Sequence, residues 1–78
     1  MDLIEMSIDD ACHIKWDIGR QKYGDTFVGE PLSELHDELI DALNYVEEAR
    51  RRGHKMGQME EQLRAMVERV KTLYAAAQ

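Results

Sequence analysis

The segment PLSELHDELIDALNYVEEARRR, residues 31 to 52, decides the fold, because it carries the clearest helical pattern in the chain. Its apolar residues step by three and four positions, which is the spacing of one face of an α-helix. Pro31 suits the first helical turn, where its missing N–H costs nothing, and Gly53 supplies a stop. The apolar positions are Leu32, Leu35, Leu39, Ala42, Val46 and Ala49. We therefore predict a helix over 31–52.

A second long helix is predicted over residues 57–77. Its apolar residues also alternate three and four apart, which gives a heptad seam about three repeats long. They are Met56, Met59, Leu63, Met66, Val70, Leu73 and Ala77. The short connection GHKMG, residues 53 to 57, is a turn of the length that makes neighbouring helices antiparallel. The two helices should therefore form a hairpin whose seams pack together or against another copy.

A shorter helix is predicted over residues 7–23. Ser7 can cap it, with Asp10 in a capping-box-like position, and Gly24 supplies the C-terminal stop. Its apolar face consists of Ile8, Ala11, Cys12, Ile14 and Ile18, with Trp16 beside it. In the connecting loop, Phe27 and Val28 are expected to tuck against the bundle.

The composition describes a small helical domain. The chain has 78 residues, of which 44% are hydrophobic and 33% charged, and a core of this size is marginal on its own. We therefore predict one domain, residues 1–78, with an all-α fold. It is a three-helix bundle, one helix plus a long antiparallel helical hairpin, and homo-oligomerisation completes it.

Charge and residue usage exclude several classes of function. The net charge of −6 does not support binding to a nucleic-acid polymer or an anionic membrane. No stretch is apolar enough to span a bilayer, and the acidic N-terminus is unlike a signal peptide. Cys12 is the single cysteine, and neither His13 nor His36 has a second ligand at zinc spacing. We expect a cytoplasmic protein in which Cys12 has a packing role.

An acidic stripe lies beside the apolar face of the 31–52 helix. At about 100° per residue, one narrow stripe contains Glu34, Glu38, Asp41, Tyr45 and Glu48. Carboxylates three and four residues apart can converge on one cation, and oxygen ligands suit Mg²⁺ or Mn²⁺. We predict that Glu34, Glu38 and Asp41 bind the metal. The alternative is a solvated helix face paired with nearby cations such as Arg50–Arg52.

The segment DELIDALNYVEEA, residues 37 to 49, resembles the E-x-x-D helix of the all-α nucleoside triphosphate pyrophosphohydrolases, the MazG-like superfamily. The preceding stretch KWDIGRQKYGDTFVGEPLSELHDEL, residues 15 to 39, is similar to small phage-encoded helical proteins. The resemblance implies a helical bundle that assembles as a dimer or tetramer and hydrolyses a nucleoside triphosphate to the monophosphate and pyrophosphate with Mg²⁺. Glu38 and Asp41 match the E-x-x-D pair.

The resemblance is incomplete in one part of the family pattern, a second cluster of acidic residues. The superfamily carries a second acidic cluster, E-E-x-x-E, on an earlier helix. The nearest counterpart here is Asp9, Asp10 and His13, at the expected start of the first helix. Glu34 is the candidate to orient or deprotonate the attacking water, so that Glu34, Glu38 and Asp41 are also the candidate catalytic residues.

Aromatic and basic residues elsewhere are candidates for nucleotide binding. A base can stack on an aromatic ring while cations meet the phosphates. The candidates are Trp16, Arg20, Lys22, Tyr45, Arg50 and Arg51. The alternative assigns Trp16 to packing and the arginines to the helix dipole. Three functions remain open: a pyrophosphohydrolase, a non-catalytic protein that sequesters a nucleotide or cyclic-nucleotide second messenger, as a phage counter-defence protein would, and a structural helical adaptor.

Overall fold

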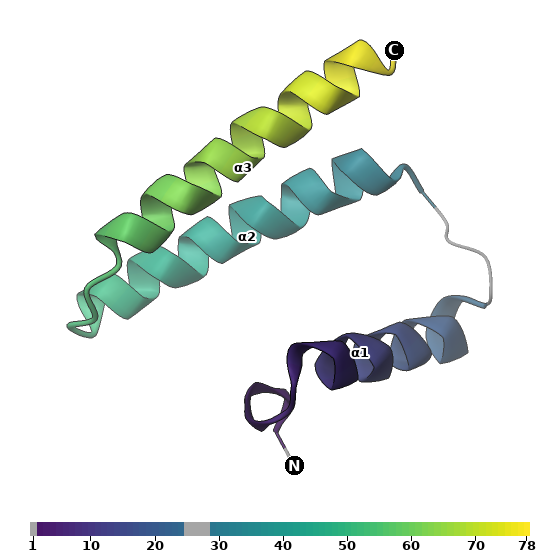
Figure 1. Ribbon diagram of the computed structural model, residues 1–78, viewed down its shortest axis with the longest axis horizontal. Helices are drawn as coiled ribbons and strands as arrows, with labels where there is room; N and C mark the ends of the chain where they lie inside the picture. Colours follow the sequence, from purple (N-terminus) through teal and green to yellow (C-terminus); the bar gives the residue numbers. More distant parts are fainter. Residues whose placement is uncertain (1, 25–28) are drawn as a thin grey trace.

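The computed structural model describes residues 2–24 and 29–78, and the fold is all-helical. A short 3₁₀ turn, η1 (Leu3–Glu5), precedes the helices α1 (Ile8–Tyr23), α2 (Pro31–Arg51) and α3 (Gly57–Ala76) (Figure 1). No strand occurs in the described ranges. The three predicted helices are confirmed, and each predicted boundary that differs is off by one residue, because a cap had been counted as helix. The 3₁₀ turn was not predicted.

Both ends of α1 are fixed by the predicted residues. The hydroxyl of Ser7 accepts a hydrogen bond from the backbone N–H of Asp10 at 3.1 Å, which satisfies one of the free amides of the first turn. Gly24 follows the last turn with φ +90°, and its N–H donates to the carbonyl of Arg20. The expected packing of Phe27 and Val28 falls in residues 25–28, outside the described ranges.

The start of α2 combines a predicted feature with an unpredicted one. Pro31 occupies the first helical position, as expected. The cap is Glu30, whose carboxylate accepts a 2.6 Å hydrogen bond from the backbone N–H of Ser33. A carboxylate at this end also interacts favourably with the positive end of the helix dipole. Residue 30 is therefore both a cap and a favourable charge.

The end of α2 is a Schellman motif built on Gly53. The N–H of His54 donates to the carbonyl of Ala49, and the N–H of Gly53 donates to the carbonyl of Arg50. Gly53 has φ +99°, a left-handed conformation that a side chain disfavours. The turn that reverses the chain between α2 and α3 thus depends on a glycine.

We expect Gly53→Ala to lower the free energy of unfolding by about 1 kcal/mol, because the Cβ penalises the left-handed backbone. Urea denaturation followed by circular dichroism measures the change. Gly57→Ala is the matched control, since Gly57 begins α3 with ordinary helical geometry and open space around the added Cβ. A Gly53→Ala variant as stable as the Gly57→Ala variant contradicts the role of the turn.

The core lies between α2 and α3. Its buried side chains are Leu39 and Val46 from α2 and Val67 and Val70 from α3, exposed by 4 to 7%. The partly buried residues packed against this core are Leu32, Leu43 and Leu63. The predicted antiparallel hairpin is therefore confirmed, and the extensive packing among the described elements is confined to it.

The predicted seams are only half right. Leu39, Val46, Leu63 and Val70 face the core as expected, but other predicted seam positions are exposed by 44 to 51%. These are Leu35, Met59, Met66 and Leu73. Leu43 and Val67, which the seams omitted, face the core instead. Each helix carries two adjoining apolar stripes, and the antiparallel contact uses only one of them.

The first helix lies apart from this core. It runs on the side of α2 that faces away from α3 (Figure 1), and the molecule extends 40 × 40 × 18 Å, so it is one helix layer thick. Ile8, Trp16 and Ile18 are 82%, 59% and 55% exposed, and Cys12 is exposed rather than packed. The expected packing role of Cys12 is therefore wrong for the single chain. In the described ranges no helix combines the length and the apolar character that crossing a membrane requires.

Candidate functional site

The three predicted metal ligands lie on the outer surface of α2. Glu34, Glu38 and Asp41 are exposed and follow one another along the helix within two turns. Tyr45, one turn beyond Asp41, is 77% exposed. Since α2 turns its Leu39 and Val46 side toward α3, the acidic stripe borders the exposed Leu35 and the half-buried Ala42 rather than the hairpin core. The acidic stripe therefore lies beside an apolar stripe, as the sequence predicted.

These three carboxylates have no ionic partner in the part of the chain that the structure describes. None of them takes part in an ion pair or a side-chain hydrogen bond there. The alternative of a helix face neutralised by Arg50–Arg52 is therefore not realised at Glu34, Glu38 or Asp41. Negative charge is left available on this stripe, where like charges at helical spacing repel each other.

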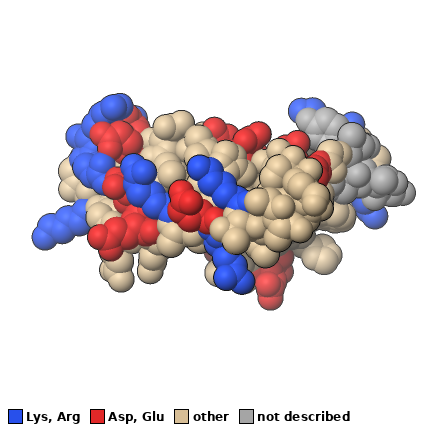
Figure 2. Space-filling view, turned by 90° about the horizontal axis from the view of Figure 1, so that it is seen from above, with Lys and Arg blue, Asp and Glu red and all other residues tan. Residues whose placement is uncertain are grey.

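The arginine cluster at the end of α2 is paired differently. Arg50 bonds to Glu47 of its own helix and to Glu60 of α3. Arg52 bonds to Glu48 at 3.2 Å, and Arg51 lies 3.5 Å from the same carboxylate. In Figure 2 the blue and red side chains mingle over the end of the hairpin that holds the α2–α3 turn. The predicted binding of phosphate by Arg50 and Arg51 requires these pairs to open.

The contact between Arg50 and Glu60 shifts the pKa of both groups in the direction that favours their charged forms. The hydrogen bond from the guanidinium lowers the pKa of the Glu60 carboxyl below its ordinary value, and the positive charge acts in the same direction. The same hydrogen bond raises the pKa of Arg50. Both side chains are partly solvated, so the pair contributes little to stability. It does show that Arg50 of α2 and Glu60 of α3 stand at the same height along the hairpin.

The predicted nucleotide-binding residues of α1 are not assembled with the acidic stripe. Trp16 is 59% exposed, and Arg20 lies 3.9 Å from Asp17 of the same helix. Lys22 also lies in the last turn of α1. The contacts of α1 with the hairpin are few in the described ranges, and no hydrogen bond or ion pair there joins α1 to the acidic stripe. The roles of Trp16, Arg20 and Lys22 stay predictions.

The carboxylates match the chemistry of a Mg²⁺ ligand set without forming a finished site. No three His, Cys, Asp or Glu side chains within residues 2–24 and 29–78 are grouped so as to hold a metal ion. Mg²⁺ commonly takes one or two carboxylates and completes its octahedron with water and substrate phosphate. Glu38 and Asp41, three residues apart and unpaired, are the pair that meets this lower requirement. A Mg²⁺ ion at this pair would need further ligands from a bound phosphate, from water or from another chain.

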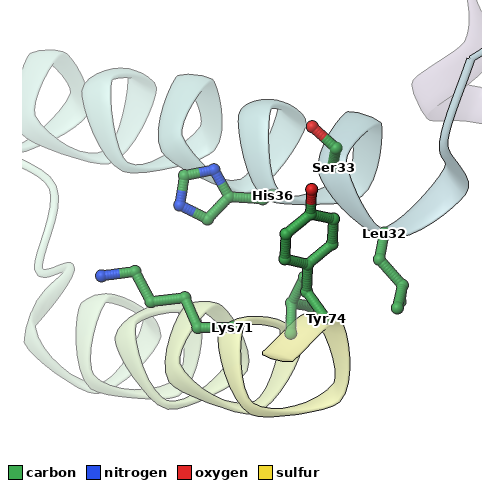
Figure 3. Close-up of a pocket in the computed structure, with 6 residues that line it drawn as sticks. Leu32, Ser33, His36, Lys71 and Tyr74 are labelled. Carbon is green, nitrogen blue, oxygen red and sulfur yellow. The ribbon is translucent and has the colours of Figure 1, made fainter. Parts of the chain in front are cut away.

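One cavity was not anticipated from the sequence. It has a volume of about 260 Å³ and lies where the start of α2 meets the end of α3. Its lining residues are Leu32, Ser33, His36, Val70, Lys71 and Tyr74. Figure 3 shows the Tyr74 hydroxyl directed toward α2 and the Lys71 ammonium extended below His36. The Nδ1 atom of His36 lies 3.2 Å from a carboxylate oxygen of Asp37. None of the predicted site residues lines this cavity, and only the pairing of α2 with α3 creates it.

Comparisons of the chain with protein-family models, with curated proteins and with solved structures find no match. The resemblance to the MazG-like superfamily therefore rests on the residues quoted from the sequence. The candidate site consists of the acidic stripe, the open apolar surface beside it and the arginine pairs.

Proposed function

We propose that the protein is a Mg²⁺-dependent nucleotide-binding helical oligomer, in which the acidic stripe of α2 holds a metal ion against the phosphates of a nucleoside triphosphate. The observation that carries this proposal is the lack of ionic partners at Glu34, Glu38 and Asp41 in the described structure, while Glu47, Glu48 and Glu60 are paired with arginines. A divalent cation would relieve the repulsion along the stripe. A cytoplasmic location is part of this proposal.

The proposed reaction is hydrolysis to the monophosphate and pyrophosphate, as the family resemblance implies. Glu38 and Asp41 would hold the metal ion, which would supply positive charge to neutralise the phosphates. Glu34, one turn before Glu38, accepts a proton from the attacking water or orients it. Trp16 or Tyr45 stacks on the base, and cations hold the phosphates. Every one of these groups is on the surface of the described chain, where a ligand can reach it.

A second candidate is a protein with the same site that sequesters a nucleotide or cyclic-nucleotide second messenger without cleaving it. The specific observation in its favour is the absence of a group of three convergent ligands in the described residues. A single Mg²⁺ held by two carboxylates is enough to bind phosphate, but a catalytic site also needs a positioned water. The two candidates share a ligand class and differ in turnover.

The test is incubation with Mg²⁺ and a panel of ribo- and deoxyribonucleoside triphosphates, with pyrophosphate release as the readout. We expect release by the wild-type chain and background rates for Asp41→Asn, because the substitution removes a metal-binding charge. Glu61→Gln is the matched control, since it removes an exposed acid from α3. Equal release by wild type and Asp41→Asn would rule out the proposed metal site.

If no nucleotide is cleaved, thermal-shift measurements with nucleoside triphosphates and cyclic dinucleotides test the second candidate. A ligand at 100 times its Kd stabilises the folded state by about 2.7 kcal/mol, which for a domain of this size raises Tm by roughly 10 °C or more. The shift should require Mg²⁺ and disappear in Asp41→Asn. A chain that shows neither cleavage nor a Mg²⁺-dependent shift is left with the adaptor function.

A further inference from the structure

The hairpin has one open apolar face, formed by both long helices. Its residues are Leu35, Ala42 and Ala49 of α2 and Met59, Met66 and Leu73 of α3. The four larger side chains are 44 to 51% exposed, while Ala42 and Ala49 are half-buried. We call this surface the open face. It repeats every seven residues on each helix, which is the spacing of a helix-packing seam.

The two stripes lie on the same side of the hairpin because of the antiparallel geometry. Residues of the open face immediately precede residues that are directed at the other helix. Ala42 precedes Leu43 and Met66 precedes Val67, both of which pack in the core. Ala49 precedes Arg50 and Met59 precedes Glu60, and these two charged residues pair across the hairpin. In antiparallel helices, positions that precede the contact positions fall on one common side. Ser33 and Lys71, which line the cavity together, mark the opposite side.

The open face requires a cover. In the described chain only four side chains are buried, and none is completely enclosed. A core this small supplies at most a few kcal/mol, whereas stable domains pack at least two layers of secondary structure around a core. The molecule is 18 Å thick in its shortest direction, which is a single layer of helices. A contiguous apolar surface of this kind marks an interaction site.

We propose that a second copy of the chain covers the open face, with α2 of each copy against α3 of the other. The heights of residues along the axes of the two helices support this choice. Arg50 stands level with Glu60, and His36 stands level with Lys71, so Ala42 stands level with Met66, and Ala49 with Met59. A twofold axis parallel to the helices keeps these levels and places each alanine opposite a methionine of the other copy. Small residues then face large ones, which allows the layers to interdigitate.

Charge distinguishes this arrangement, with α2 against α3, from the other twofold arrangement, with α2 against α2. In the proposed dimer, Glu38 stands level with Arg69 of the second copy, and neither residue has an ionic partner in the described part of its own chain. A twofold axis across the helices instead sets α2 against α2, so that the acidic stripes of both copies meet. Like charges that face each other across an interface are unfavourable. The complementary pairing of α2 with α3 is therefore the one that the surface favours.

The second copy also supplies a group that the acidic stripe lacks. Arg69 of the second copy comes beside Glu38, where its guanidinium can bind a phosphate group that lies at the acidic stripe. This step rests on the proposed function, whereas the dimer does not. It explains why the stripe is incomplete in one chain: the cation that would hold the phosphate belongs to the other chain. Arg69 was not among the residues that the sequence suggested.

Disulfide cross-linking of full-length chains tests the dimer. In a Cys12→Ser background, one tagged chain carries Ala42→Cys and a second, untagged chain carries Met66→Cys. After mixing and oxidation with oxidised glutathione, we expect a covalent heterodimer, and no cross-linked dimer from either variant alone. Cross-linking of the Ala42→Cys chain with itself would show α2 against α2 and overturn the proposed arrangement. A monomer by light scattering, with no cross-link in any mixture, would overturn the dimer itself.

Arg69→Gln tests the role of the second copy in the site. We expect its Kd for a Mg²⁺-nucleotide to be about tenfold higher or more, because a charged hydrogen bond to phosphate is lost, while the cross-link between positions 42 and 66 still forms. Arg64→Gln is the control, since Arg64 bonds to Glu60 within its own helix. An unchanged Kd in Arg69→Gln overturns this role. Cross-linking without any nucleotide binding in the wild type would refute the proposed function and leave the dimer standing.

Discussion

Val67→Asp is expected to unfold the hairpin. Val67 is 6% exposed and packs with Leu39 and Val70 in the centre of the core. A carboxylate placed there loses its hydration among apolar side chains, and the burial of a charge costs several kcal/mol. Because a core of this size supplies only about 3–5 kcal/mol, the loss is as large as the stability of the domain. Far-ultraviolet circular dichroism should show the helical signal largely lost at ambient temperature.

Ala65→Asp is the matched control for Val67→Asp. Ala65 lies two residues earlier on α3 and is exposed, so the same charge is added to the same helix but in water. Its cost should be limited to helix propensity, about 0.5 kcal/mol, and the helical signal should remain. Equal loss of structure in both variants would mean that added negative charge, and not burial, is responsible. A folded Val67→Asp variant would contradict the position of the core.

Leu39→Ala is expected to lower the free energy of unfolding by about 2–5 kcal/mol. Leu39 is 7% exposed and is the α2 residue that contacts the buried valines of α3. Truncation to alanine removes its apolar contacts and leaves a cavity that a rigid pair of helices refills only in part. For a chain of this length the loss corresponds to a fall in Tm of roughly 10 °C or more. Thermal denaturation at several protein concentrations measures it.

Ile40→Ala provides the comparison for Leu39→Ala. Ile40 is the next residue along α2, carries a side chain of the same size and is 39% exposed. Its truncation should cost less than that of Leu39, since a larger part of Ile40 is already in contact with water. A larger loss for Ile40→Ala than for Leu39→Ala would show that α2 turns a different face toward α3.

The local signals in the sequence determined the helices and their ends. Ser7, Gly24, Pro31 and Gly53 act through their own backbone and side-chain chemistry within one or two turns, so each predicted boundary could be derived without knowledge of the partner helix. The hairpin followed from two adjacent amphipathic patterns and a short turn. The acidic stripe was also predictable, because helical spacing alone fixes which side chains share a face.

The tertiary structure decided which of two apolar stripes on each helix became the core. Leu35 and Leu43 are equally apolar, and Met66 and Val67 are both apolar. The register and rotation of α2 against α3 pack Leu43 and Val67 into the core and leave Leu35 and Met66 open. A periodic pattern specifies an apolar face to within about one residue step, or 100°, which spans both stripes. Long-range packing alone removes this ambiguity, and it also creates the cavity beside His36 and the pairing of Arg50 with Glu60.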